Sequence, residues 1–348
     1  MSPPADSVLV LYNLPPDEAV RAAGALYDES MVGVLDEVAV VSAALETVGI
    51  ACRSVGIRAL AELPPVLLAS PERIVFNLVE WFPEQPTDAY LVPAVCKAFA
   101  KEYTGNTTPC QVLAANKWQT SGVLRNAGLP CPQSFIVEHQ QAALTLPFDP
   151  PYIVKPLCTD ASEGITAASV IRRKSRPALL RAVATVAQQC RQPALIEAFI
   201  DGREVNVSLL QDGDSVRVLP LAEIEFRNYK ANKPRIIDYA AKWLPHSFEY
   251  QNTVRVVPAL LAEETAAAIT RCARAAWQTT GCRDYARVDL RLDPRNRPWI
   301  LEVNPNPDIS PNAGFAAALT AAGLTFEMFV QLLVRNALKR LRDAPDEP

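Results

Sequence analysis

Two segments near the carboxyl end of the chain alternate polar and apolar residues in a pattern that few folds accommodate. In the first, Arg287 and Asp289 flank a valine; in the second, Glu302 and Asn304 flank another. Residues i and i+2 of a strand point to the same face, and the short turn at 293–297 makes the two strands antiparallel neighbours. We therefore predict a hairpin with one apolar face and one polar face, on which two carboxylates, an amide oxygen and a guanidinium converge.

The oxygen atoms on this polar face suggest a metal site. Hard oxygen ligands suit Mg²⁺, which proteins usually hold with one or two carboxylates while substrate phosphates complete the shell. The plainer alternative is an exposed hairpin with ordinary surface charges. The alternating apolar residues, Val288 and Leu290 in one strand and Leu301 and Val303 in the other, fit both interpretations.

Charge and composition exclude several classes of protein. The chain has 34 Lys and Arg against 38 Asp and Glu, a net charge of -4, and no long basic run, which argues against a nucleic-acid binder. Glycine is scarce, with 13 in 348 residues against 30 prolines. No Gly-x-Gly-x-x-Gly follows the first predicted strand, Val8–Tyr12, so a nicotinamide dehydrogenase lacks its phosphate-binding fingerprint.

Cysteine and histidine usage points to the cytoplasm and away from other metals. The eight cysteines are scattered without a Cys-x-x-Cys pair, as expected for reduced thiols. The only two histidines, His139 and His246, exclude a histidine-rich metal site, and we expect both to lie in ordinary loops. No apolar stretch approaches the ~18 residues of a membrane helix, and the amino terminus lacks the pattern of a secretion signal.

The order of predicted elements gives an α/β region followed by two α+β regions. In residues 1–108 we expect strands and helices of an open α/β sheet, with a helix at Asp36–Val48 that stops at Gly49. Residues 109–205 and 206–348 are the predicted second and third domains. The elements expected in these two domains are a helix at Gln111–Asn126, strands near 133–138 and at Tyr152–Pro156, a helix at Ala178–Gln189, a strand at Ala194–Phe199, a helix at Glu263–Thr280, strands at Asp284–Leu292 and Pro298–Asn304, and a helix at Thr325–Leu341.

Two connections carry further expectations. Asp201-Gly202 is a strong turn signal and predicts a hairpin that leads into a strand at Glu204–Leu210. Residues 226–245 form a long loop with several charges and aromatic rings. Loops of this length in a compact domain are usually functional lids, so we predict a lid there.

Four further residues have functional and plain interpretations. Lys155 closes an apolar strand before a loop of small residues, which suits a point charge on phosphate, although a strand-end lysine can simply reach solvent. Lys117 alone reads as a solvated helix charge. Glu204 suits paired sugar hydroxyls, and the backbone of Ala198–Ile200 after Glu197 suits a base edge. The alternative is two exposed acids beside a turn.

Taken in order, these motifs resemble the ATP-grasp ligases, and most of all the D-alanine–D-alanine ligase group. The resemblance covers about residues 74 to 340. It rests on Val75-Phe-Asn77, Tyr103-Thr-Gly105, Lys117, Lys155-Pro156, Glu197 to Glu204, Asp238-Tyr-x-x-Lys242, Arg287-x-Asp289 and Glu302-x-Asn304.

The resemblance implies an ATP-grasp fold in which a Rossmann-like domain precedes two α+β subdomains that sandwich ATP. It places Lys117, Lys155 and Ser162 on the phosphates, and Lys242 on the γ-phosphate as the lid closes. It assigns acyl-group orientation and oxyanion stabilisation to Arg287. The resemblance assigns the binding of adenine and ribose to Glu197, Ala198, Phe199, Ile200 and Glu204. The resemblance implies that Asp289, Glu302 and Asn304 bind two Mg²⁺ ions, for which Mn²⁺ can substitute. A homodimer is also implied.

The sequence departs from the family pattern at positions near the amino-acid substrates. The phosphate-covering loop usually reads Gly-Ser-Ser-x-Gly, but here Asp160 and Ala161 replace its first two residues. The lid tyrosine is Trp243, and the glycine beside the acceptor site is Asp308. A serine that usually binds the second substrate falls at about Ala313. The glutamate that reads the first amino group is not visible, Glu18 being the nearest acid.

These departures predict an ADP-forming ligase that joins an amino-acid carboxylate to an amine through an acylphosphate, with non-standard substrates. Asp308 would favour a cationic acceptor, because a carboxylate there repels another carboxylate. A true D-alanine–D-alanine ligase is the alternative within the class. A non-catalytic ATP-binding sensor is the alternative outside it, and the retained metal-site residues and lysines argue against it.

Overall fold

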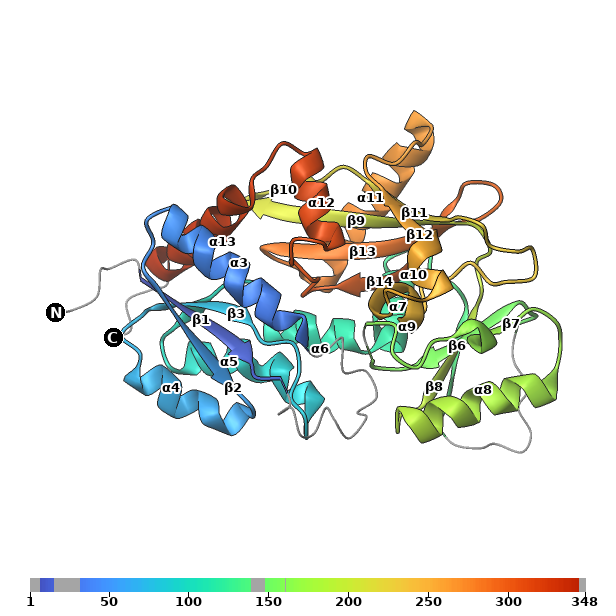
Figure 1. Ribbon diagram of the computed structural model, residues 1–348, viewed down its shortest axis with the longest axis horizontal. Coiled ribbons are helices and arrows are strands. Elements are labelled where there is room, and N and C mark those ends of the chain that lie inside the picture. The colour runs from blue at the N-terminus through green and yellow to red at the C-terminus, as the bar shows by residue number, and fades with distance from the viewer. Residues whose placement is uncertain (1–6, 16–31, 139–147, 160, 344–348) are drawn as a thin grey trace.

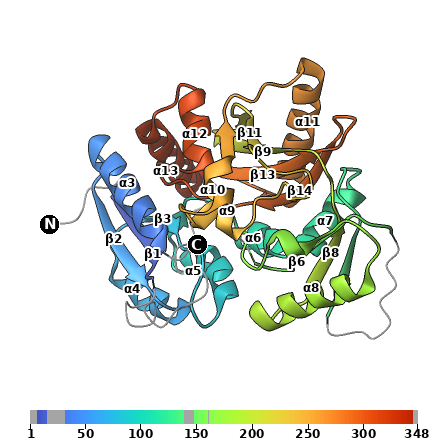
Figure 2. The same cartoon turned by 45° about the vertical axis from the view of Figure 1, so that its right-hand side comes forward.

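The computed structural model describes residues 7–15, 32–138, 148–159 and 161–343. Its strands form three sheets, one for each third of the chain (Figure 1). The amino-terminal sheet and the carboxyl-terminal sheet lie side by side, and the middle sheet lies at the far end beneath the carboxyl-terminal one (Figures 1 and 2).

The amino-terminal sheet is parallel and covered on both faces. Its order is β2-β1-β3-β4, from β1 (Val8–Asn13), β2 (Cys52–Ile57), β3 (Ile74–Leu78) and β4 (Glu102–Tyr103). The continuous apolar run that starts β1 is fully buried, as expected for a parallel strand between two helical layers. One layer contains α3 (Val34–Thr47), and the other contains α4 (Leu63–Ala69) and α5 (Val92–Ala98).

The middle sheet is antiparallel and has a helix on one face only. Its order is β5-β8-β6-β7, from β5 (Ser134–Val137), β6 (Tyr152–Pro156), β7 (Val170–Ile171) and β8 (Ala194–Ala198). The apolar residues Val154 and Ile196 pack with α8 (Arg176–Gln189). Lys155 and Glu197 alternate with them and therefore point to the opposite face.

The carboxyl-terminal sheet carries the predicted hairpin. Its order is β12-β11-β9-β13-β14, and β10 pairs with β9. Helix α11 (Glu263–Thr280) packs on the face that presents Val205, Val288 and Leu290. The strands are β9 (Arg203–Asp212), β10 (Ser215–Val218), β11 (Ala222–Phe226), β12 (Thr253–Val256), β13 (Tyr285–Leu292) and β14 (Pro298–Asn304).

The last two helices connect the ends of the chain. Helix α12 (Gly314–Ala321) and helix α13 (Phe326–Asp343) follow the hairpin. Phe329 and Leu333 of α13 share a core with Val8 and Val10 of β1. Among the described residues no single helix has the length and apolarity to cross a membrane; α12 and α13 meet those criteria only together, across a bend of 101°.

One predicted helix is wrong, because the stretch 111–126 is two helices. They are α6 (Thr108–Ala115) and α7 (Lys117–Asn126), separated by Asn116. Asn116 adopts an extended backbone (φ -97, ψ 99), and its side chain accepts a hydrogen bond from the Gln119 N–H. Asparagine is a strong N-cap, so it ends one helix and begins the next, which places Lys117 in the first turn of α7.

The hairpin predicted at Asp201-Gly202 is also wrong, because β8 and β9 belong to different sheets. Gly202 is required for a steric reason instead. A Cβ at Gly202 would lie 1.8 Å from the Leu292 carbonyl oxygen, so only glycine lets the connection pass this close to the end of β13. The turn signal at Asp212-Gly213 does form a hairpin, between β9 and β10.

The predicted lid, 226–245, is not entirely irregular. It contains helix α9 (Tyr239–Trp243), and helix α10 (Phe248–Asn252) follows it. The Asp238 carboxylate accepts a hydrogen bond from the Ala241 N–H and caps α9. In the described part of the chain, short 3-10 helices also lie at Leu60–Glu62, Pro86–Leu91 and Ala167–Ser169.

Candidate active site

The predicted convergence on β13 and β14 is present. Arg287 lies opposite Asn304, and Asp289 lies opposite Glu302. The pairing shifts register directly after Asp289, as at the bulges that often occur beside active sites. The four polar side chains therefore occupy one face, opposite the core under α11.

Asp289 is held by two neighbours. Arg287 donates to both of its oxygens, from Nε to Oδ1 at 2.7 Å and from Nη2 to Oδ2 at 2.8 Å. Asn206, which lies opposite Asp289 on β9, donates from Nδ2 to Oδ1 at 2.7 Å. The Asn304 Oδ1 accepts from the Asn306 N–H at 3.0 Å. These contacts fix the orientation of two of the three predicted metal ligands.

Four cations surround Glu302. Burial opposes ionisation of its carboxyl, but Lys117, Lys155, Lys242 and Arg287 outweigh burial and lower its pKa to about 2. The Lys117 Nζ lies 3.9 Å from Glu302 Oε2 and donates to the Thr159 carbonyl at 2.5 Å. Lys117 reaches this position because α7 begins at it, after the break at Asn116. The local residue pattern gave no reason to place it here; only the family resemblance did.

Lys242 comes from the lid yet belongs to the same cluster. Burial lowers its pKa, and Arg287 lowers it further, while Glu302, Asp289 and Glu204 raise it. Its charge therefore acts on both acids of the hairpin. The lid lysine and the hairpin carboxylates lie together even though they are distant in sequence.

The middle sheet contributes a buried ion pair. The Lys155 Nζ lies 2.6 Å from Glu197 Oε2, with side-chain exposures of 7% and 2%. In the segment after Glu197, the N–H groups of Ala198 and Phe199 donate to the carbonyls of Gln133 and Pro151. The Ile200 N–H has no hydrogen-bond partner among the described residues. Of these three N–H groups, it is therefore the one that remains for a base edge.

Glu204 of β9 lies near the hairpin acids. Its Oε2 accepts from Arg291 Nη1 at 2.8 Å, and the two side chains lie opposite each other on β9 and β13. Burial raises the pKa of Glu204; Arg291 lowers it, while the negative charge of Asp289 raises it further. Glu204 therefore lies close to the hairpin acids.

The lid is attached to the loop that follows β6. The Ser162 Oγ donates to the Ile237 carbonyl at 2.9 Å, and the Trp243 indole N–H donates to the Ala161 carbonyl at 3.0 Å. Ala161 and Ser162 both have positive φ, 55 and 61. Two successive left-handed residues other than glycine are strained, a state that clusters at ligand clamps. Asp160 lies outside the described residues.

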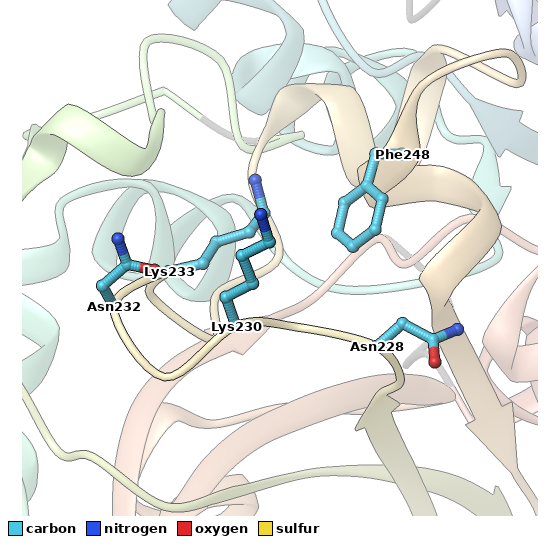
Figure 3. A pocket seen from close by; sticks show the side chains of 5 residues that line it. All are labelled: Asn228, Lys230, Asn232, Lys233 and Phe248. Carbon is cyan, nitrogen blue, oxygen red and sulfur yellow. The ribbon is translucent and has the colours of Figure 1, made fainter.

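The outer surface of the lid has its own pocket. Figure 3 shows Lys230 and Lys233 rising from one stretch of the lid beside Phe248, around a pocket of about 310 Å³. Lys233 pairs with Glu249, and its Nζ lies 5.4 and 5.3 Å from the ring centres of Tyr229 and Phe248. These contacts join the lid to α10.

The loop after β14 carries one carboxyl, Asp308, and contacts a second, Glu37 of α3. Asp308 accepts from the Ser310 N–H at 2.8 Å, and Glu37 of α3 accepts from the Ile309 N–H at 2.7 Å. Burial, followed by the charges of Glu80 and Asp308, raises the pKa of Glu37 well above its ordinary value. Asp308 also acts on Arg287 and Arg255, so this loop lies beside the cation cluster.

Sequence reasoning missed four residues of this region. Asn206 and Arg291 continue the same alternation, two residues beyond Glu204 and Asp289, and that rule could have found them. Glu37 and Arg255 carry no such signal, because they lie on distant elements. Glu18 and His139 fall outside the described residues.

The donor set fits the groups that the resemblance implies. Two carboxylates and an amide oxygen on one face are hard ligands suited to Mg²⁺. A cluster of lysines beside them suits a triphosphate. The buried Arg291 Nε, which has no hydrogen-bond partner among the described residues, adds a donor beside Glu204.

Comparison with known proteins gives the family. Residues 123–335 match the model of the D-ala D-ala ligase C-terminus. An uncharacterised protein of Sinorhizobium fredii, y4sG, is 30% identical over 80% of this chain and 78% of its own. A D-alanine–D-alanine ligase of a Synechococcus strain, JA-3-3Ab, is 30% identical over 70% of this chain and 71% of its own.

The fold agrees. The structure of D-alanine–D-alanine ligase from Bacillus anthracis complexed with ATP superposes with a TM-score of 0.72, at 17% identity, over 97% of this chain and 99% of that one. The protein is therefore a carboxylate–amine ligase with the ATP-grasp fold, a class that uses ATP, Mg²⁺ and small-molecule substrates. Within this class, the chain belongs to the D-alanine–D-alanine ligase family.

Proposed function

We propose that the protein forms an amide or dipeptide bond between an amino-acid carboxylate and an amine, with an acylphosphate as intermediate and ADP and phosphate as products. The observation that carries this proposal is the group of four cations around Glu302, beside Asp289. Phosphoryl transfer needs little covalent help from side chains and much electrostatic stabilisation. A cleft with this charge arrangement meets that need.

Different residues of the proposed site bind different parts of the triphosphate. Lys117 and Lys155 hold phosphate oxygens, Ser162 supports the loop over them, and Lys242 meets the γ-phosphate from the lid. Two Mg²⁺, or Mn²⁺ in their place, would neutralise the developing charge. Asp289, Glu302 and Asn304 are the ligands proposed for them.

The nucleoside is assigned to the other end of the cleft. Glu197 and the backbone of Ala198, Phe199 and Ile200 face the base, and Glu204 faces the ribose. The hydrogen bond from Trp243 to Ala161 keeps the lid over the phosphate loop. A closed lid excludes the water that would hydrolyse an acylphosphate.

The chemical steps use Arg287 at the acyl end. An oxygen of the donor carboxylate attacks the γ-phosphorus of ATP, and the bond to ADP breaks. The acceptor amine then attacks the acyl carbon, phosphate leaves with the C–O bond pair, and the amine loses a proton. The Arg287 guanidinium stabilises the oxyanion of the tetrahedral intermediate. Its bidentate contact with Asp289 fixes its orientation.

The acceptor is proposed to differ from D-alanine and to carry a positive charge. Asp308 stands where the family has glycine, and the buried carboxyl of Glu37 lies beside it. The Asp308 carboxylate at this place favours a cationic group and repels a second carboxylate. The proposed substrates are therefore non-standard for the family.

The test is an ADP-release screen. Purified protein, Mg²⁺ and ATP are combined with pairs of L- and D-amino acids and amines, with Asp289→Asn as the inactive control, and mass spectrometry identifies the products. We expect amino-acid-dependent ADP release with a cationic acceptor and a weaker preference for that acceptor in Asp308→Asn. Absence of ADP release across a broad panel would favour a non-catalytic ATP-binding sensor. An unchanged preference in Asp308→Asn would remove the role of Asp308.

D-alanine–D-alanine ligation is the second candidate, because two relatives from Synechococcus strains that match at 30% identity carry that name. It predicts ADP release with D-alanine alone and a single product, D-alanyl-D-alanine. The proposal further places the reaction in the cytoplasm, in a homodimer, with domains at 1–108, 109–205 and 206–348 and a lid at 226–245.

A further inference from the structure

Arg291 contacts three segments of the chain beside the proposed nucleotide site. Its Nη1 donates to Glu204 Oε2 and to the Arg235 carbonyl of the lid, both at 2.8 Å, and its Nη2 donates to the Gly202 carbonyl at 2.8 Å. Its guanidinium lies 5.0 Å from the ring centre of Phe199, in the segment after β8. Arg291 therefore contacts the strand β9, the lid and the connection between the two ATP-grasp sheets.

The side chain belongs to the cleft face of β13. Arg287, Asp289 and Arg291 alternate with Val288, Leu290 and Leu292, which pack in the core under α11. On the neighbouring strand β9, Glu204 and Asn206 lie opposite Arg291 and Asp289. The sugar-facing acid of the proposed site and Arg291 are thus direct cross-strand neighbours.

One donor of this arginine is unused. The side chain is buried, with 2% of its surface exposed, and its Nε has no hydrogen-bond partner among the described residues. A buried polar group without a partner is costly in free energy. Among the described residues, the Asn13 Nδ2 is the other buried side-chain donor without a partner, and it lies on β1 of the amino-terminal sheet. The Arg291 Nε lies instead beside the acid assigned to the ribose, where a ligand can supply the acceptor.

The neighbouring acid has a matching acceptor. Glu204 uses Oε2 for Arg291, and its Oε1 accepts no hydrogen bond from any described residue. An N–H donor beside a carboxylate acceptor complements a hydroxyl group, which both accepts and donates. A pair of adjacent hydroxyls, as on a ribose, can use both at once.

We propose that Arg291 and Glu204 together read the ribose hydroxyls of the nucleotide, with the Arg291 Nε–H donating to a hydroxyl oxygen and Glu204 Oε1 accepting from a hydroxyl. This inference rests on the proposed function, because it takes the nucleoside to lie at this end of the cleft. It makes Arg291 a specificity-determining residue that selects ribonucleotides over deoxyribonucleotides.

The experiment measures binding rather than turnover. Isothermal titration of the full chain with Mg²⁺ and either ATP or 2′,3′-dideoxy-ATP, without amino acids, gives the two dissociation constants. The wild type is expected to bind ATP about tenfold or more tightly than the dideoxy analogue, because a hydrogen bond to a charged group is lost. In Arg291→Met, ATP should bind about tenfold more weakly and the analogue as before, so the discrimination disappears.

The controls separate this role from a structural one. Arg297→Met, at the exposed turn of the same hairpin, should leave both constants unchanged. If the methionine variant does not fold, Arg291→Lys keeps a cation beside Glu204 and should lose the same discrimination. Equal affinities of the wild type for both nucleotides, or equal losses for both in the variant, would overturn the inference. Failure of the wild type to bind ATP at all would instead overturn the proposed function.

Discussion

Two buried clusters of charged side chains differ in how their carboxylates are satisfied. The first, which we call the junction cluster, consists of Glu102, Arg283, Asp284 and Arg340, where β4, β13 and α13 meet. Both of its carboxylates are fully buried. The second, which we call the cleft cluster, consists of Lys117, Lys155, Lys242, Arg287, Asp289 and Glu302.

In the junction cluster every carboxylate oxygen has a donor. Asp284 accepts from Arg340 at 2.8 and 2.9 Å and from the Gly105 N–H at 2.8 Å. Glu102 accepts from Arg340 Nε at 2.8 Å, and its other oxygen pairs with Lys97. These bonds join the amino-terminal sheet to the carboxyl-terminal helix.

In the cleft cluster Glu302 is stabilised differently. Its side chain keeps 31% exposure, and Lys117 approaches it only to 3.9 Å. No described residue donates a hydrogen bond to its carboxylate. The cations lower its pKa through their field, while its oxygen lone pairs remain available. The hydrogen-bonded carboxylates of the junction cluster therefore hold parts of the fold together, whereas Glu302 is ionised and keeps oxygen lone pairs with which it can bind a metal.

Removing a junction arginine should give the largest effect. Arg340→Met leaves two buried carboxylates without their main partner, so the free energy of unfolding should fall by about 3–5 kcal/mol. Urea denaturation measures this change. Arg335→Met, on the same helix but in an exposed pair with Asp212, should change it by less than about 1 kcal/mol. Similar losses of unfolding free energy in the two variants would mean that the junction cluster stabilises the fold no more than an exposed ion pair does.

Changing a cleft carboxylate should affect turnover instead of stability. Glu302→Gln removes a proposed metal ligand and the charge that balances the lysines, so kcat/KM for ADP release should fall by about 10²–10³-fold. The unfolding free energy should change far less than in Arg340→Met. Glu264→Gln, exposed on α11, is the matched control and should retain full activity. Stability lost in step with activity would place Glu302 in the class of structural carboxylates.

The local elements of both regions could be read from the sequence. The bounds of α11 and β14 were predicted residue for residue, because an amphipathic period and a short polar turn define them locally. The pairing of Asp289 with Glu302 followed from the same turn. The convergence of the hairpin acids was therefore predictable from about twenty residues.

The errors arose where distant segments determine the conformation. Asn116 breaks a helix whose apolar period is continuous, and the break matters because it brings Lys117 to Glu302. Gly202 reads as a hairpin turn, but its conformation is set by the Leu292 carbonyl about ninety residues away. The junction cluster was not predicted at all. Arg340 and Glu102 are 238 residues apart in the sequence, and no local pattern links them.

Glu37 is in a third kind of environment. Its carboxyl has neither the full set of hydrogen-bond donors of the junction cluster nor the surrounding cations of the cleft cluster. Burial, with the charges of Glu80 and Asp308, raises its pKa well above 4.5 in the folded state. The folded protein therefore keeps a proton that the unfolded chain releases at about that pH. Stability should accordingly fall as pH rises from about 4.5 through the raised pKa, by up to about 1.4 kcal/mol per pH unit.

Glu37→Gln tests this environment, because glutamine resembles the protonated acid and cannot ionise. The unfolding free energy of the variant, measured by urea denaturation between pH 5 and 8, should lose the part of the slope that Glu37 contributes. Its advantage over the wild type should therefore grow with pH. Glu46→Gln, exposed on the same helix α3, should follow the wild-type slope. Parallel curves for Glu37→Gln and the wild type would show that Glu37 is ionised in the folded protein. Glu37 would then belong with Glu302, as a carboxylate kept charged by its surroundings.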